Sequence, residues 1–287
     1  VGNAGSSCSV TATKAQSTNY NAATSASVTI TITKANQTAS FTSSASNPIA
    51  LGTYTATATA TSGLTVAITV DSASSAVCSI SGSTVTYLSS GSCVLNADQS
   101  GNGNYNAAST AQQTITVAKA AQSITFAQPA DMDVTATATA LTATASSNLQ
   151  IAFALGSGTT NSACSVTAGG SVTPLAVGTC EITADQAGNA TYSAAPRVTR
   201  SFAIQRATQT ALTITSASTV GYGNTIALTT SGGSGTGAVS FATTGTCSVS
   251  GTTLIVGNAG SACTVTATKA ADSTYSAVSS AAQTVTI

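Results

Sequence analysis

A tyrosine follows a cysteine by twelve positions at four places in this chain, and these places recur at a nearly constant interval. The four cysteines are offset from one another by 85, 87 and 83 positions, and three of them follow another cysteine by 15 or 16 positions. Self-similarity with a fixed period of this length indicates a structural unit that has been copied along the chain. The four pairs are Cys8/Tyr20, Cys93/Tyr105, Cys180/Tyr192 and Cys263/Tyr275.

The period divides the chain into a partial unit and three full ones. Residues 1–15 and 256–270 are identical at 13 of 15 positions, so Val1 is expected to lie inside a unit of a longer protein. A full unit can bury one small core, which is marginal without a cross-link. We therefore expect the C-terminal part of a truncated Ig-like repeat at 1–33, followed by repeat 1 (34–118), repeat 2 (119–205) and repeat 3 (206–287).

A short motif marks each join between units: a basic residue, an alanine, a variable residue and a glutamine. Runs of alternating polar and apolar residues lie on both sides of it, and no Gly/Ser-rich or Pro-rich spacer separates them. Such direct passage from strand to strand predicts little hinge motion and a linear rod of units. The motifs are KANQ at 34–37, KAAQ at 119–122 and RATQ at 206–209.

Within a unit the apolar residues alternate with a period of two. Residues 54–61, 64–70 and 84–88 follow this pattern, with Ser/Gly-rich turns between them. About seven short strands, punctuated every 8 to 12 residues, are typical of a β-sandwich. The predicted fold class is therefore all-β, with tandem Ig-like β-sandwich domains.

The charge content limits the classes of partner. Only 5% of residues are charged and the formal net charge is zero, so no basic surface for nucleic acid is expected. The mean hydropathy is positive at +0.29, but it arises from Ala and Val alternating with Thr. No run approaches the ~20 apolar residues of a spanning helix, and membrane insertion of this region is not expected.

Three cysteine pairs bracket a strand that has a turn at each end, and a disulfide between its flanking strands is geometrically reasonable. Closing a loop of ~15 residues contributes on the order of 3 kcal/mol. A metal site is disfavoured because the chain has no histidine and no C-x-x-C motif. Disulfides imply an oxidising, extracytoplasmic compartment. The expected pairs are Cys78/Cys93, Cys164/Cys180 and Cys247/Cys263.

Cys8 is the odd cysteine. Its partner is expected either in the missing upstream half of its unit or in another molecule. The tyrosines of the repeated pairs, Tyr20, Tyr105, Tyr192 and Tyr275, are interpreted as structural tyrosine corners, each with a half-buried ring and a hydroxyl bonded to the backbone. The alternative for these rings is a platform on which a sugar stacks.

Catalysis is not expected. Without histidine there is no Ser-His or Cys-His dyad, and Glu181 is the only glutamate. No cofactor and no metal are expected, although Asp131 and Asp133 have the D-x-D spacing of some calcium loops. Asp98 and Asp185 are expected to bond the amides of the turns that follow them.

Threonines recur at every second position in segments such as 135–139. Flat threonine ladders can bind ice, but they require a solenoid whose coil repeats every dozen or so residues. A period near 85 does not stack threonines in this way, so we expect exposed strand threonines, which are also potential sites for O-linked sugars.

The segments 77–109 (VCSISGSTVTYLSSGSCVLNADQSGNGNYNAAS) and 179–204 (TCEITADQAGNATYSAAPRVTRSFAI) resemble bacterial Ig-like domain repeats of large surface proteins and adhesins. The likeness extends over essentially the whole chain. It implies an extracellular or cell-surface protein whose repeats form a stalk or filament. The partners it implies are neighbouring repeats, further copies in a fibre, and a host or matrix surface. The first alternative is a module that binds glycan or protein through inter-strand loops, for which 232–237 (GGSGTG) is the one hint. A third possibility is an appendage to a secreted enzyme whose catalytic domain lies outside this sequence.

Overall fold

The computed structural model describes residues 2–287; Val1, and with it the expectation that the chain starts inside a unit, lies outside the described residues. The residues fall into two compact units. The first comprises the chain up to Gln122 with Ala187–Ala194, and the second comprises Ser123–Gln186 with Ala195–Ile287. Within 2–287 the structure is strands and loops plus one short 3-10 helix, which confirms the predicted all-β class.

The first unit begins with a hairpin whose residues are almost all exposed. Its outer strands pair antiparallel, with Cys8 opposite Ile30 and Val10 opposite Val28. Since opposite residues of an antiparallel pair share a face, these four side chains lie together on one side. The strands of this N-terminal hairpin are β1 (Ser7–Val10), β2 (Thr13–Lys14), β3 (Ala23–Thr24) and β4 (Val28–Thr31).

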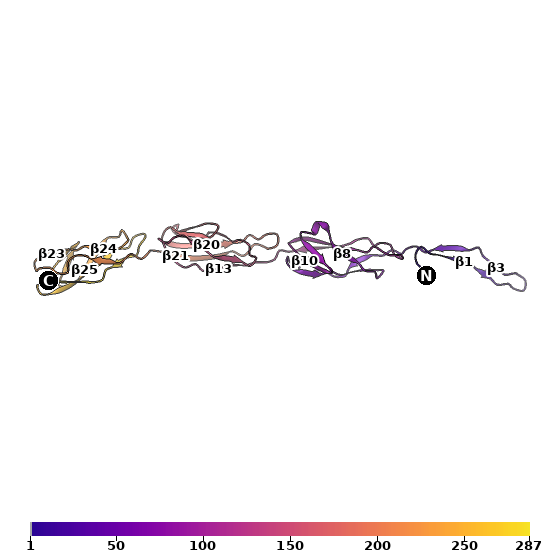
Figure 1. Ribbon diagram of the computed structural model, residues 1–287, viewed down its shortest axis with the longest axis horizontal. Helices are drawn as coiled ribbons and strands as arrows, with labels where there is room; N and C mark the ends of the chain where they lie inside the picture. Colours follow the sequence, from indigo (N-terminus) through magenta and orange to yellow (C-terminus); the bar gives the residue numbers. More distant parts are fainter. Residues whose placement is uncertain (1) are drawn as a thin grey trace. The chain divides into compact units, whose positions relative to one another are not determined.

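Repeat 1 follows as a two-layer sandwich, of which β8 and β10 are labelled in Figure 1. One layer has β5 paired with β7 and β6 paired with β10, which also pairs with β9. The other has the order β12-β11-β8. Its elements are β5 (Ala39–Phe41), β6 (Thr53–Thr55), β7 (Ala58–Ala60), β8 (Ala67–Val70), η1 (Ser72–Ser74), β9 (Cys78–Ser81), β10 (Thr84–Tyr87), β11 (Gly91–Asp98) and β12 (Ala111–Val117).

The strand expected at 54–61 is split into β6 and β7, because its two halves pair with different neighbours. The chain between β5 and β6 crosses to the other layer, where Ile49 pairs in parallel with Ala118. Alternation then decides which side chains enter the core. Along β11, Cys93, Leu95 and Ala97 are fully buried while the residues between them are not.

The second unit contains most of repeat 2. One layer has the order β14-β21-β20-β17 and the other contains β15-β19-β18 with β13 paired to β16; β13, β20 and β21 are labelled in Figure 1. The strands are β13 (Ile124–Phe126), β14 (Met132–Asp133), β15 (Thr139–Ala140), β16 (Ala143–Ala145), β17 (Ala152–Leu155), β18 (Cys164–Val166), β19 (Ser171–Pro174), β20 (Gly178–Asp185) and β21 (Val198–Gln205).

Repeat 3, also in the second unit, has the same plan. The layers contain β23-β27-β26 with β22 paired to β24, and β25-β28 with β29 and β30 also on β28. Its strands are β22 (Leu212–Ile214), β23 (Thr225–Ala227), β24 (Thr230–Gly232), β25 (Val239–Gly245), β26 (Ser248–Ser250), β27 (Thr253–Ile255), β28 (Ala262–Lys269), β29 (Val278–Ser279) and β30 (Gln283–Thr286).

Three separate hydrophobic clusters form the cores, and each draws its residues from one repeat. The first contains Val85 and Leu95, the second Phe126 and Ile182, and the third Leu254 and Val265. Each therefore joins side chains from the two layers of one sandwich. The boundaries 34–118, 119–205 and 206–287 remain predictions, since the contacts group the chain into two units and not three.

Candidate functional site

Each repeat carries one disulfide that connects its two layers. In repeat 1, Cys78 begins β9 and Cys93 lies in β11 of the other sheet, with the Cα atoms 5.8 Å apart. Both residues are buried beside the central strand β10. Cys164–Cys180 and Cys247–Cys263 make the matching connections, with Cα separations of 5.6 and 5.8 Å. These bridges join the two layers of each sandwich at its core.

Cys8 is a free, exposed thiol. It lies on the face of the N-terminal hairpin that also presents Val10, Val28 and Ile30, which are 51%, 63% and 50% exposed. The same face of repeat 1 is covered: Cys93 and Leu95, on the matching strand, have no exposed surface. The hairpin thus has the pattern of a core strand pair without the layer that would bury it.

The repeated tyrosine lies where the chain returns to the start of its own repeat. Ala35, Ala120 and Ala207, the alanines of the three junction motifs, pair in parallel with Tyr105, Tyr192 and Tyr275. The contact is entirely backbone: Ala35 N donates to Asn104 O and Asn106 N donates to Ala35 O, both at 2.9 Å. The first residues of each repeat are thereby tied to a segment about 70 residues further along the chain.

A buried glutamine in the same motif strengthens this tie, and its role was not foreseen from the sequence. Gln37 Nε2 donates to Asn106 O at 2.7 Å and to Gln99 Oε1 at 2.5 Å. Gln122 and Gln209 donate to Ser193 O at 2.6 Å and to Ser276 O at 2.7 Å. All three glutamines are at most 7% exposed. The signal was present, because glutamine is the fourth residue of every junction motif.

The expected bond from the tyrosine hydroxyl to the backbone is not found. Over residues 2–287, the hydroxyls of Tyr20, Tyr105, Tyr192 and Tyr275 make no hydrogen bond, and Tyr20 is 76% exposed. What holds the corner is an Asx turn three residues earlier. Asn102 Oδ1 accepts from Asn104 N and Tyr105 N, and Asn189 does the same for Thr191 N and Tyr192 N. A short amide side chain suits this turn because it reaches its own backbone two residues on.

Repeat 3 uses a carboxylate in this position. Asp272 Oδ1 accepts from Thr274 N at 2.8 Å and Tyr275 N at 2.7 Å, and Oδ2 accepts from Thr236 N at 2.6 Å. These backbone bonds, with that from Thr236 the largest influence, hold the pKa of the Asp272 carboxyl well below its usual range. The corner of repeat 3 therefore depends on a charged group, whereas those of repeats 1 and 2 do not.

The other aspartates have local partners. Asp98 accepts from the hydroxyl of Thr110 and Asp185 forms an ion pair of 2.7 Å with Arg197. The expectation that they bond turn amides was wrong for both, because the next residue, a glutamine, takes that role in repeat 1: Gly101 N donates to Gln99 Oε1 at 2.5 Å.

The carboxylate of Asp131 is likewise occupied, since it accepts from Ala203 N at 2.7 Å and from Gln205 Nε2 at 3.1 Å. Within residues 2–287, no group of three or more Asp, Glu, Cys or His side chains comes close enough to hold a metal ion. Both aspartates of the D-x-D motif are engaged with β21: Asp131 through its carboxylate and Asp133 through strand pairing with Gln205.

The Gly-rich loop 232–237, the hint for a binding loop, is engaged within repeat 3. Gly233 O accepts from Lys269 Nζ at 3.0 Å, Gly235 N donates to Gln209 Oε1 at 3.1 Å, and Thr236 bonds Asp272. These bonds use the polar groups that a ligand would need. The loop packs against the corner of its own repeat.

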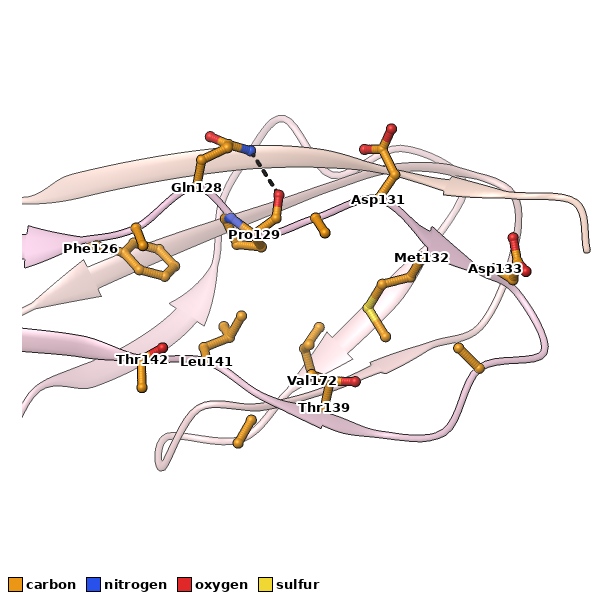
Figure 2. A pocket seen from close by; sticks show the side chains of 14 residues that line it. Phe126, Gln128, Pro129, Asp131, Met132, Asp133, Thr139, Leu141, Thr142 and Val172 are labelled. Atoms are coloured by element: carbon orange, nitrogen blue, oxygen red, sulfur yellow. Dashed lines mark hydrogen bonds between the residues drawn. The ribbon is translucent and has the colours of Figure 1, made fainter.

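A hollow lies in repeat 2, where the chain crosses from β13 to β14. It has a volume of about 440 Å³ and opens beside Thr139 and Leu141 on the neighbouring strand. Figure 2 shows Met132, Leu141 and Val172 directed into it, whereas the carboxylate of Asp131 points away. Most of the lining side chains are apolar, and the polar ones are Gln128, Asp131, Asp133, Thr139 and Thr142. This arrangement is suited to hold an apolar body with one polar end.

No helix among the described residues is long and apolar enough to cross a membrane. No protein-family model matches the chain, and a search of curated proteins finds no match. The solved structures that resemble it include cadherin-type ectodomains and a surface-layer protein.

Drosophila N-cadherin EC1-4 shares 12% identity with the chain over 95% of it and 80% of the cadherin fragment, with a TM-score of 0.30. Protocadherin gammaB7 EC3-6 shares 12% identity over 97% of this chain and 81% of that one, with a TM-score of 0.32. The S-layer protein rSbsC(31-844) shares 15% identity over 96% of this chain and 44% of that one, with a TM-score of 0.29. With TM-scores this low, the assignment of the fold rests on the sheets described above and not on these similarities.

Proposed function

We propose that the chain is a structural extracellular repeat region of a bacterial surface or secreted protein. Its disulfide-linked sandwiches act as a stalk, or as a fibre-forming segment, that supports adhesion or an extracellular filament. The role is mechanical, and neither catalysis nor a cofactor is part of the proposal. Neighbouring repeats are the first partners, and copies in a fibre or a host or matrix surface are the next.

The observation that carries the proposal is the length of the joins. Ala118 still pairs with Ile49 of repeat 1, and Ala120 already pairs with Tyr192 of repeat 2, so Lys119 alone lies between them. Arg206 is likewise the one residue between Gln205, paired with Asp133, and Ala207, paired with Tyr275. A link of one residue has almost no conformational freedom to lose, which is what a stalk under load requires.

The disulfides support the extracellular part of the proposal. Cross-links of this kind persist in oxidising compartments and are rare in the bacterial cytosol. They also compensate for small cores that contain few large side chains. In repeat 3, for example, the fully buried apolar side chains are Leu254, Val265 and Val285, together with small residues.

The alternative function, recognition of glycan or protein through inter-strand loops, has weaker support. The loop proposed for it, 232–237, has its polar groups bonded within repeat 3. A half-buried tyrosine remains at each corner, but its main chain is fixed in the junction and there is one such ring per repeat.

Small-angle X-ray scattering of the whole chain tests the proposal. A compact globule of this chain length has a radius of gyration of about 19 Å, and a stalk must give a value well above it. A measured radius that matched the globule would remove the basis of the stalk. As a control, a flexible Gly-Ser spacer inserted after Lys119 should broaden the distribution of interatomic distances and shorten its most frequent long separations. A radius that rises with protein concentration would favour the fibre over the stalk.

A further inference from the structure

The hollow of repeat 2 borders a strand position that carries a small residue there and a large one in the other repeats. Val172 of the central strand β19 lies opposite Thr139. The matching central strands place Val85 opposite Tyr54 in repeat 1 and Leu254 opposite Ile226 in repeat 3. A threonine leaves the space beside the crossover unfilled, because its side chain is much smaller than the tyrosine or isoleucine that occupies the position elsewhere.

Repeat 1 shows what fits this space. The ring of Tyr54 packs against the core, and its hydroxyl bonds Ser43 Oγ and donates to Gln113 Oε1 at 3.2 Å. The hollow that remains around Tyr54 has a volume of about 130 Å³, compared with about 440 Å³ in repeat 2. Repeat 2 lacks the phenolic ring at this position, and its hollow is the larger of the two.

At the polar end of the space Arg200 takes the place of Gln113, but a polar side chain also follows β13 as one follows β5. Gln128 stands two residues after Phe126, as Ser43 stands two residues after Phe41. Gln128 Nε2 donates to Ser201 O at 2.6 Å and to Pro129 O at 3.3 Å, which leaves its carbonyl oxygen as an acceptor. Figure 2 shows this oxygen directed away from Met132, Leu141 and Val172, so only a hydroxyl that projects out of the hollow past Pro129 can reach it. A ring between Met132 and Leu141 would have apolar contacts along its body, and a hydroxyl that extends out of the hollow would have the Gln128 oxygen as its acceptor.

We propose that the hollow of repeat 2 is a binding site for a phenolic ring, in which the ring takes the place that Tyr54 fills in repeat 1. The ring lies against Phe126, Met132, Leu141 and Val172, and the hydroxyl donates to Gln128. The same chemistry is presented by a free phenolic compound and by a tyrosine side chain of a polypeptide. The proposal does not depend on the stalk function, because it concerns the interior edge of one repeat.

Met132 makes a direct test possible, since it is the single methionine of the chain. Labelling with methyl-¹³C methionine gives one NMR signal, and that signal reports from the wall of the hollow. Titration of the full chain with p-cresol should shift the methyl signal upfield in a saturable manner, because an aromatic face lies over the methyl group. Toluene should bind several-fold more weakly than p-cresol, since it lacks the hydroxyl.

Variants that fill the space provide the control. Thr139→Tyr reproduces repeat 1, and Thr139→Ile reproduces repeat 3 in case the larger ring prevents folding. Each should abolish the p-cresol shift while the cores of repeats 1 and 3 stay unchanged. Thr137→Tyr, the same substitution two residues away at an exposed position, should leave it intact. Gln128→Leu should remove the preference for p-cresol over toluene.

A parallel titration with N-acetyl-tyrosinamide distinguishes the two sources of the ring. Tighter binding than p-cresol assigns the site to a tyrosine of a polypeptide, and weaker binding assigns it to a free phenol. The proposal is overturned if p-cresol leaves the Met132 methyl signal unmoved up to its solubility limit. It is also overturned if the shift persists in both Thr139 variants, because the ring would then bind elsewhere.

Discussion

Gln37 donates a hydrogen bond of 2.7 Å from its side-chain amide to the main-chain oxygen of Asn106, a residue 69 positions further along the chain. Gln209 makes the matching bond to Ser276 O, also at 2.7 Å. These bonds close each repeat by joining its start to the turn that precedes its last strands. Since the glutamines are buried, their own side-chain amides have little access to water as an alternative partner.

Replacement of Gln37 by leucine is therefore expected to destabilise repeat 1 by about 2 kcal/mol, because Asn106 O loses its donor and the buried Gln99 Oε1 keeps only the bond from Gly101 N. Amide hydrogen exchange, followed by mass spectrometry, measures this as faster exchange in β5 and in residues 99–106. Gln112→Leu, at an exposed position, is the matched control and should change exchange little. Equal effects of the two substitutions would contradict the role assigned to Gln37.

Asp272 is expected to make repeat 3 the acid-sensitive repeat. Its pKa is lower in the folded state than in the unfolded chain, so its contribution to stability is present above the unfolded value of about 3.9. That contribution is lost as the pH falls below about 4 toward the folded pKa. Hydrogen exchange of repeat 3 between about pH 6 and pH 2.5 should show this loss, after correction for the intrinsic exchange rate.

Asn102 and Asn189 occupy the same place in repeats 1 and 2, and they supply the control. Asp272→Asn keeps the acceptor for Thr274 N and Tyr275 N but carries no charge. The variant should be less stable than the native chain near neutral pH, because the bond to Thr236 N is lost, and its corner should no longer respond to acid. A variant that kept the full acid response would assign that response to another group.

Tyr105→Phe is expected to be nearly neutral, within about 0.5 kcal/mol, because the hydroxyl has no partner. Tyr105→Ala should cost about 2 kcal/mol, since it removes a half-buried ring from the corner. Urea titration of the near-ultraviolet signal, together with exchange in residues 99–106, separates the two. A cost of about 1 kcal/mol or more for the phenylalanine variant would restore the hydroxyl bond that the sequence led us to expect.

Replacement of both Cys164 and Cys180 by alanine should lower the stability of repeat 2 by about 3 kcal/mol, since the bridge closes a loop of 16 residues. Peptide mapping without reductant should recover Cys78 with Cys93, Cys164 with Cys180, and Cys247 with Cys263. Cys8→Ser is the control and should leave melting unchanged, because Cys8 is exposed and unbridged in the structure. Bridges between repeats would contradict the assignment.

The predictable part of this fold is the part that depends on local pattern. Alternation of side chains fixes which residues of β11 and β20 are buried, and the short spacing within each cysteine pair is enough to span one central strand. What could not be predicted depends on register between distant strands. Thr139 belongs to an array in which the sequence does not distinguish it from Thr135 and Thr137. Only its pairing with Val172 places it beside the hollow of repeat 2.

The corner shows the same limit. A tyrosine at a fixed distance from a cysteine suggested that the ring and its hydroxyl matter, because a repeated large side chain usually has a specific contact. The structure assigns the fixed contacts to the tyrosine main chain, to Asn102 and to Gln37. Backbone pairing does not depend on side-chain type and cannot be recognised in a sequence. The repeated tyrosine therefore indicated where the corner lies but not which groups hold it.

The disulfides also set how far each sandwich can lengthen when it is pulled from its ends. If the strands of repeat 1 separate, the residues between Cys78 and Cys93 remain a closed loop, because the chain tension passes through the sulfur atoms. With a separation of 15 residues, the loop withholds about 50 Å of contour at about 3.4 Å per residue. A tether made of such repeats would lengthen in fixed steps, each about 50 Å shorter than the step of a repeat without the disulfide.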